Sequence, residues 1–195
     1  DMALIAEQTG LDGDSKQAVL KELFKADDIK DCGIDLTEKV YAFETTDGSL
    51  GMVAKVDDET RLTEWINKLQ SSGVCSQMTE KKGFRFSVLH GNFIMGYSAS
   101  ALLIMGPVLE SGKAELQRKM IKYLKADDET GITQTKLYEK LMGLNAPITL
   151  IAQAEALPEK FVSPFTLGAP KDASPRDIII AATVSVENGH MTING

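Results

Sequence analysis

Three short turn signals stand between apolar runs, and they constrain the fold of this chain more than any other feature. The turns are Asp47-Gly48, His90-Gly91-Asn92 and Asn188-Gly189. Each joins two predicted strands, namely residues 40–44 with 50–56, 84–88 with 93–97, and 178–186 with 191–193. Gly preceded by Asp or Asn supplies the positive φ angles that tight hairpins need. Strands joined by such short turns are antiparallel, which argues against a doubly wound parallel fold.

Apolar residues at the 3.6-residue period predict helices between these hairpins. The clearest helix begins after Asp57 or Asp58 as N-cap and ends at Ser72-Gly73. Its inner face carries Leu62, Trp65, Ile66 and Leu69. Further helices are predicted over residues 3–10, from 15 to about 26, 110–125 and 135–144. Two more strands are predicted over 102–105 and 148–154, and an irregular connection over 158–175. This order predicts an α+β fold whose antiparallel sheet carries its helices on one face.

A short internal echo suggests two related halves. Residues 21–28 read KELFKADD and residues 121–128 read IKYLKADD, and both segments end a predicted amphipathic helix. We therefore expect a first α+β half over 1–109 and a second, incomplete half over 110–195, with one continuous domain as the alternative.

The two ends of the sequence indicate a piece of a longer protein. The chain opens at Asp1-Met2 without an initiator Met in first place, and it stops at Asn194-Gly195, a dipeptide typical of hairpin turns. The longest apolar stretch, residues 101–109, is far too short to cross a bilayer. We expect no membrane span in this chain.

The overall charge is acidic, with 28 Asp and Glu against 21 Lys and Arg and a formal net charge of −7. A nucleic-acid partner requires a basic surface to neutralise phosphates, so we expect none.

The two cysteines, Cys32 and Cys75, have no second Cys or His at metal-ligand spacing. Both lie in short polar connections. Two buried thiols, a disulfide across a long loop and a reactive thiol all remain open.

The remaining candidates for chemistry have simpler structural explanations. Each histidine, His90 and His190, adjoins a predicted turn without a second ligand or catalytic partner nearby in sequence. The acidic pairs fit helix ends and solvated faces, and they are Asp27-Asp28, Asp57-Asp58 and Asp127-Asp128. Asp12-Gly13-Asp14 begins like a calcium loop but lacks the downstream glutamate. Trp65 lies on a helical apolar stripe and is predicted to be core. We therefore predict no catalytic, cofactor-binding or metal-ligating residue and no cofactor.

Three segments resemble an uncharacterised family of predicted lipoproteins from gut Bacteroidetes. They are DMALIAEQTGL (1–11), GIDLTEKVYAFETTDG (33–48) and GMVAKVDDETRLTEWINKL (51–69). The resemblance implies an α+β protein of the cell envelope, facing the periplasm or the cell exterior. It also implies a lipid anchor that would lie outside this sequence. It supplies no catalytic residues.

Two functions are compatible with these observations. The first is a non-enzymatic envelope module that binds a protein or polymer partner through its sheet or a helix face. The second is a hydrolase whose carboxylates come together from distant segments. We favour the first, because the sequence contains no cluster of groups typical of a catalytic site.

Overall fold

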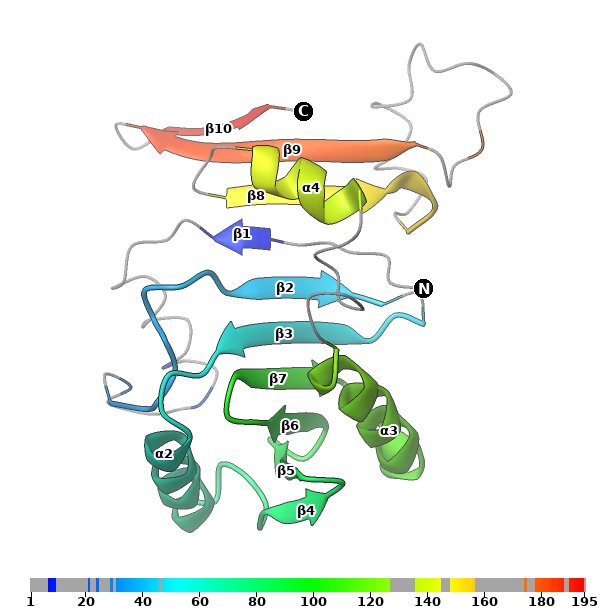
Figure 1. Ribbon diagram of the computed structural model, residues 1–195. Coiled ribbons are helices and arrows are strands. Elements are labelled where there is room, and N and C mark those ends of the chain that lie inside the picture. Colours follow the sequence, from blue (N-terminus) through cyan, green and yellow to red (C-terminus); the bar gives the residue numbers. More distant parts are fainter. Residues whose placement is uncertain are drawn as a thin grey trace.

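In the computed structural model, ten strands of the described part of the chain form one antiparallel sheet (Figure 1). The structure describes residues 7–9, 21, 24, 29, 31–45, 47–126, 136–144, 148–156, 174, 178–187 and 190–194. The strands are β1 (Glu7–Thr9), β2 (Tyr41–Glu44), β3 (Leu50–Lys55), β4 (Thr79–Lys81), β5 (Phe84–Leu89), β6 (Phe93–Tyr97), β7 (Ala101–Gly106), β8 (Ile148–Gln153), β9 (Ile179–Glu187) and β10 (His190–Asn194). Their order across the sheet is β10-β9-β8-β1-β2-β3-β7-β6-β5-β4.

Helices cover this sheet. Those with described bounds are α2 (Glu59–Ser71), α3 (Lys113–Leu124) and α4 (Lys136–Gly143), with 3-10 turns η1 (Glu110–Gly112) and η3 (Ala154–Ala156). The predicted α+β class and its antiparallel sheet are therefore confirmed.

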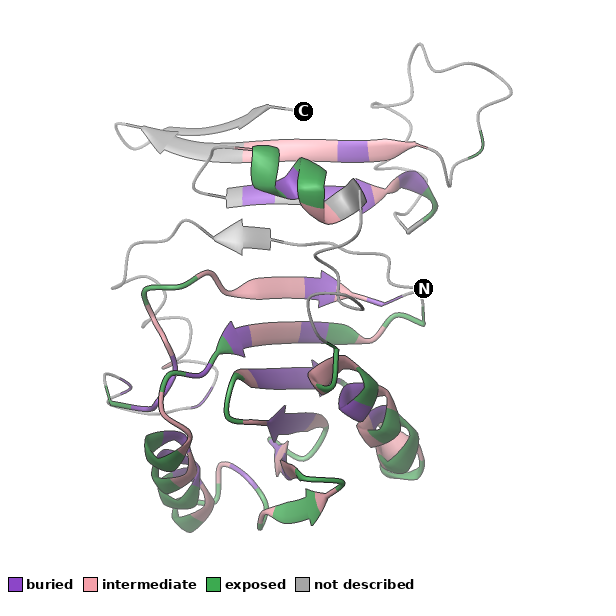
Figure 2. Cartoon of the chain, in the orientation of Figure 1, coloured by how far each residue is buried: buried purple, intermediate pink, exposed green. Residues whose placement is uncertain are grey.

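The helices lie on both faces of the sheet, which corrects the prediction that they pack on one. The inner side of α2 packs against Leu102 and Ile104 of β7. The inner side of α3 packs against Leu103 and Met105 of the same strand, which point the opposite way because side chains alternate along a strand. Four consecutive apolar residues are buried here, so this strand requires cover on both faces (Figure 2).

The N-terminal segment contains the strand β1 within residues 3–10, which corrects the helix predicted there. Glu7 pairs with Ala42 of β2, and Thr9 pairs with Ile148 of β8, so β1 joins the two sides of the sheet. A three-residue strand is too short for a periodic signal, and its pairing partners lie far away in sequence.

The short edge strand β4 was also not predicted. It joins β5 through Lys82 and Gly83, whose φ angles of 54° and 81° suit a two-residue hairpin turn. The predicted turn between β5 and β6 is confirmed, and there His90 and Gly91 have φ angles of 50° and 82°.

The helix predicted around residues 15–26 falls largely outside the described residues, although Lys21 and Phe24 are helical and Phe24 is buried. The irregular connection predicted over 158–175 also lies outside them except for residue 174, as does half of the sequence echo. Both expected halves contribute strands to the same sheet, because β8 pairs with β1. The division at residue 109 stays a prediction.

Candidate functional site

A polar row, made of Glu80, Arg85 and Tyr97, crosses strands β4, β5 and β6 at one edge of the sheet. Arg85 on β5 lies directly opposite Glu80 of β4 on one side and Tyr97 of β6 on the other. Directly opposite residues in antiparallel strands point to the same face. The face that carries this row is the one that α2 covers, since Tyr97 belongs to the core beneath that helix.

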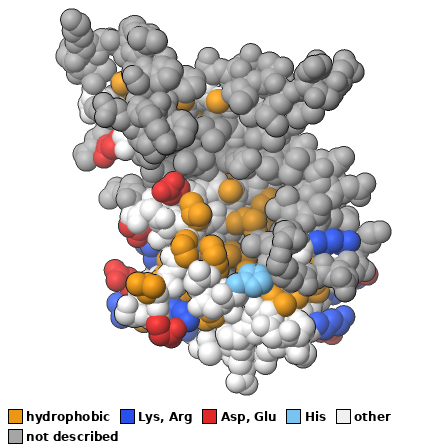
Figure 3. All heavy atoms as spheres, turned by 180° about the vertical axis from the view of Figure 1, so that it is seen from behind, with side chains coloured by type: hydrophobic (Ala, Val, Ile, Leu, Met, Phe, Trp, Pro, Cys, Tyr) orange, Lys and Arg blue, Asp and Glu red, His pale blue; other side chains and the backbone are white. Residues whose placement is uncertain are grey.

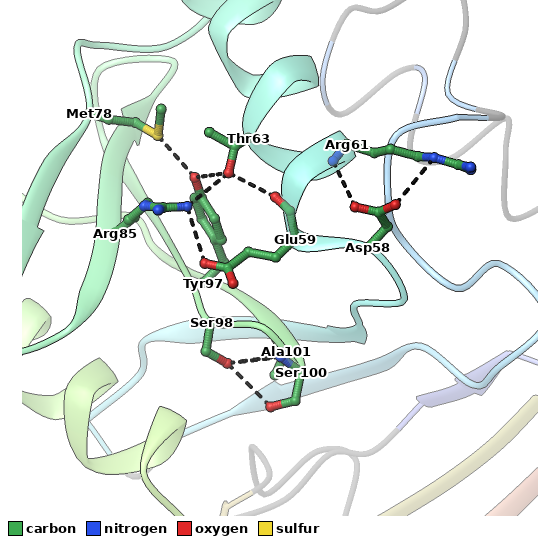
Figure 4. A network of polar contacts seen from close by, with 10 residues as sticks. All are labelled: Asp58, Glu59, Arg61, Thr63, Met78, Arg85, Tyr97, Ser98, Ser100 and Ala101. Carbon is green, nitrogen blue, oxygen red and sulfur yellow. Dashed lines mark hydrogen bonds and ion pairs between the residues drawn. The ribbon is translucent and has the colours of Figure 1, made fainter.

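The N-terminal turn of α2 supplies the other side of the site. Asp58 is its N-cap and accepts a hydrogen bond from the backbone N–H of Arg61 at 3.0 Å. This cap fixes where the first helical turn begins, so Glu59 and Thr63, one turn apart, point toward β5 (Figure 4).

One guanidinium nitrogen joins the helix to the sheet. Arg85 Nη1 donates to Thr63 Oγ1 at 2.9 Å and to Glu59 Oε1 at 3.1 Å. Thr63 Oγ1 in turn donates to the backbone carbonyl of Glu59 at 2.8 Å. The Tyr97 hydroxyl lies 3.1 Å from Thr63 Oγ1 and donates to Met78 Sδ at 3.1 Å. The result is one connected polar network between α2 and the edge of the sheet.

The inner part of this network is buried and its outer part is open to solvent. Tyr97 is only 1% exposed, whereas the side chains of Arg85 and Glu59 are each 40% exposed. The guanidinium carbon lies 5.9 Å from the centre of the Tyr97 ring, which adds a cation–π contact. Within the described part of the chain, Nε and Nη2 of Arg85 make no hydrogen bond. The site therefore combines a fixed guanidinium with a side chain that is partly open to solvent.

The acidic pairs and histidines do not converge into a catalytic site among the residues described. Asp58 caps α2, as one of the two predicted N-cap alternatives. His90 is an exposed turn residue, and the histidine drawn in Figure 3 lies at the molecular surface. The side chain of His190 and the pairs at 27–28 and 127–128 lie outside the described residues, as does the segment 12–14. No group of three or more potential metal ligands occurs in the part of the chain that the structure describes.

Both cysteines are buried thiols and neither forms a disulfide, which settles the alternatives in favour of two buried thiols. Cys32 and Cys75 belong to the core beneath α2. Burial raises the pKa of the Cys75 thiol, so the reactive thiolate is disfavoured. Trp65 is a core residue as predicted, and its ring packs edge-on against Phe24 with centroids 4.6 Å apart.

A second polar contact ties the β2–β3 hairpin to α3. Lys119 Nζ lies 2.8 Å from Asp47 Oδ2, and the hydroxyl of Thr45 donates to the other carboxylate oxygen. The hydrogen bond from Lys119, followed by that from Thr45, lowers the pKa of Asp47. Burial raises the pKa of nearby Tyr123, whose ring meets Phe43 edge-on. Each group here already has a partner, so this contact serves the packing of α3.

The comparison with known families places nearly the whole chain in one family. A family described as a domain of unknown function (DUF4836) matches residues 3–195. The chain belongs to the DUF4836 family. The DUF4836 match agrees with the expected membership of an uncharacterised family, and it extends over both predicted halves. No curated protein and no solved structure gave a significant match.

The described helices of this DUF4836 domain are all short. The longest, α2, has 13 residues, and none of the described helices is long and apolar enough to cross a membrane.

Sequence reasoning missed the site around Arg85. The alternation of Phe84, Arg85 and Phe86 places the arginine on the opposite face from its two neighbours. That signal could identify Arg85 as a polar residue of one sheet face. Its partners could not be identified, because Glu59 and Thr63 approach it only through the packing of α2.

Proposed function

We propose that this DUF4836 domain is a non-enzymatic binding module of the cell envelope, and that Arg85 lies at the centre of its binding surface. The observation that carries the proposal is the fixed, half-exposed guanidinium of Arg85. Its side chain is held by Glu59 and Thr63 of α2, while Nε and Nη2 remain without partners in the described chain.

A guanidinium held in this way is suited to recognition. A free arginine loses side-chain entropy when it binds, whereas a fixed arginine has already lost it during folding. Arginine is also one of the residues that most often dominate binding surfaces. The rigid strand and helix that carry Arg85, Glu59 and Thr63 position its donors more accurately than a loop would.

The test compares binding of purified envelope polymers and envelope proteins to the wild-type chain and two variants. Arg85→Gln removes the charge and the planar donor set. Arg61→Ala serves as the matched control, because Arg61 lies on the same helix and its exposed side chain pairs with Asp58 and Asp31. We expect Arg85→Gln to weaken binding at least tenfold and Arg61→Ala to leave it unchanged. Equal binding by all three proteins, or catalytic turnover of a bound polymer, would contradict the proposal.

A carboxylate-based hydrolase is the second candidate, and one observation favours it. Glu59 and Glu80, which are far apart in sequence, both face Arg85. Hydrolases of this type need one carboxyl group held protonated by an apolar environment. Both carboxylates here are exposed or half-exposed beside a permanent cation, so we rank this function below binding. Loss of a measured hydrolytic activity in both Glu59→Gln and Glu80→Gln, with folding intact, would reverse that order.

The envelope location and the lipid anchor belong to this proposal and rest on the sequence resemblance. They are tested on the native full-length protein by cell fractionation and by metabolic labelling with a fatty acid. We expect the protein in the envelope fraction with the label attached. Recovery of unlabelled protein from the cytoplasm would contradict this part of the proposal.

A further inference from the structure

We infer that the site around Arg85 binds an uncharged, hydroxyl-rich ligand, of which a neutral saccharide chain is the natural example. This inference rests on the proposed binding function and adds the chemical class of the ligand. It follows from the charge, the hydrogen-bonding groups, the rigidity and the surroundings of the site.

The local charge disfavours an anionic ligand. Arg85 is the one cation in the polar row, and it faces two carboxylates, Glu59 from α2 and Glu80 from β4. Lys81 follows Glu80 on the strand and therefore points to the opposite face of the sheet. A phosphate, sulfate or carboxylate would meet a site that already carries an excess of negative charge.

The free hydrogen-bonding groups match those of neighbouring hydroxyls. Nε and Nη2 of Arg85 are available to donate hydrogen bonds. The second carboxylate oxygen of Glu59 has no hydrogen-bond partner among the described residues and is available to accept one. Each sugar hydroxyl both donates and accepts. Adjacent hydroxyls can therefore accept from the guanidinium and donate to the carboxylate at the same time.

The site is also fixed in place before any ligand arrives. Thr63 Oγ1 receives the hydrogen bond from Arg85 and is itself anchored to the carbonyl of Glu59. The buried Tyr97 supports the guanidinium from beneath. A rigid donor set matters for a hydroxyl ligand, because each hydrogen bond to it replaces one to water and contributes little net free energy.

The surroundings favour a saccharide over a protein partner. Protein interfaces depend on large apolar side chains that become buried at their centre. The exposed large hydrophobic residues of the described chain are Leu50, Leu109 and Met142, and none of them belongs to the polar row or to its contacts. In β3, Ala54 lies in line with the polar row, and Leu50 lies at the opposite end of the strand. The site therefore offers hydrogen bonds without an apolar anchor.

The experiment is an NMR titration of the isotope-labelled chain with three defined sets of probes. The first set contains neutral oligosaccharides of four to six glucose, mannose, galactose or N-acetylglucosamine units. The second contains uronic-acid oligosaccharides of the same length, and the third contains acidic peptides. The wild-type chain is compared with Arg85→Gln, Arg85→Lys and the control Arg61→Ala, each first shown to be folded by its spectrum.

We expect at least one neutral oligosaccharide to shift the resonances of residues around Arg85 and Glu59. Arg85→Gln should abolish these shifts. Arg85→Lys should weaken binding about tenfold, because an ammonium retains the charge but loses the planar set of donors. Arg61→Ala should bind as the wild-type chain does.

The outcomes separate this inference from the proposed function. Binding of uronates or acidic peptides at Arg85, with no binding of neutral sugars, overturns the inference and leaves the binding function in place. Loss of envelope binding altogether, with no shift from any probe set, overturns both. Binding of neutral sugars that is unchanged in Arg85→Gln overturns the location of the site.

Discussion

Asp47 and Lys119 are 72 positions apart in the chain, and their side chains meet at 2.8 Å between Oδ2 and Nζ. This contact attaches the tip of the β2–β3 hairpin to α3. In the folded protein the hydrogen bonds from Lys119 and Thr45 hold the pKa of Asp47 below its ordinary value of 3.8. The folded state therefore binds this proton less tightly than the unfolded state does.

The pairing of Asp47 with Lys119 predicts a pH-dependent contribution to stability. It is fully present above the unfolded pKa of 3.8 and is lost as the pH falls below that value through the folded pKa. Because the Asp47 side chain is 59% exposed, we expect Asp47→Asn to cost no more than about 1 kcal/mol at pH 7. Urea unfolding of both proteins between pH 7 and pH 2 measures this difference, which should shrink in acid. A difference that is constant with pH would contradict the assignment.

Gly33 is expected to be among the glycines least tolerant of a side chain. Its φ is +76°, and a Cβ there would lie 2.3 Å from the carbonyl oxygen of Asp58 and 2.5 Å from the backbone nitrogen of Leu62. Those atoms belong to the start of α2 and cannot move without shifting the helix. Gly73, with a φ of +79° and nothing within 4 Å of its Cβ position, provides the matched control.

We expect Gly33→Ala to destabilise the fold by about 3 kcal/mol or more and Gly73→Ala by about 1 kcal/mol, since only the first adds a backbone clash to the cost of the positive φ. Chemical denaturation monitored by Trp65 fluorescence measures both. Equal losses of unfolding free energy would show that α2 does not pack on Gly33 as closely as described.

Gly96 makes room for a ring of the neighbouring strand. A Cβ at this position would lie 2.5 Å from Cε1 of Phe86. We expect Gly96→Ala to cost about 1 to 3 kcal/mol through overpacking of the core beneath α3. In a double-mutant cycle, Phe86→Leu should relieve part of that cost, so the two changes together should destabilise less than their sum. Additive losses would contradict a direct contact.

The two thiols should react only when the protein unfolds. Cys32 is 1% exposed and Cys75 is 7% exposed, and burial raises the pKa of the Cys75 thiol. We expect reaction with an aromatic disulfide reagent at pH 8 to be slow in the native protein and fast in 6 M guanidinium chloride. Each thiolate of the unfolded chain forms a mixed disulfide with the reagent, so two equivalents of aromatic thiolate should be released from the reagent. Rapid reaction of the native protein would show that one cysteine is accessible.

Local signals in the sequence were sufficient for several elements of this fold. The period of Leu62, Trp65, Ile66 and Leu69 predicted α2, and the predicted N-cap, Asp57 or Asp58, marked its start to within one residue. Gly48 and Gly91, both with positive φ, marked two hairpins. Such signals suffice because helix periodicity, capping and turn geometry depend on residues within a few positions of one another.

Only the tertiary structure decided how these elements meet. The strand β1 is three residues long, and it forms because the distant strands β2 and β8 offer their backbones for pairing. The placement of α2 and α3 on opposite faces follows from the two-sided apolar strand β7, and the network of Arg85 with Glu59 and Thr63 follows from the docking of α2. The sequence by itself determined the helix α2 and the hairpins β2–β3 and β5–β6, through local backbone preferences. Their arrangement, and with it the candidate site, depended on packing between residues far apart in the chain. Such packing leaves no periodic pattern or fixed spacing in the sequence.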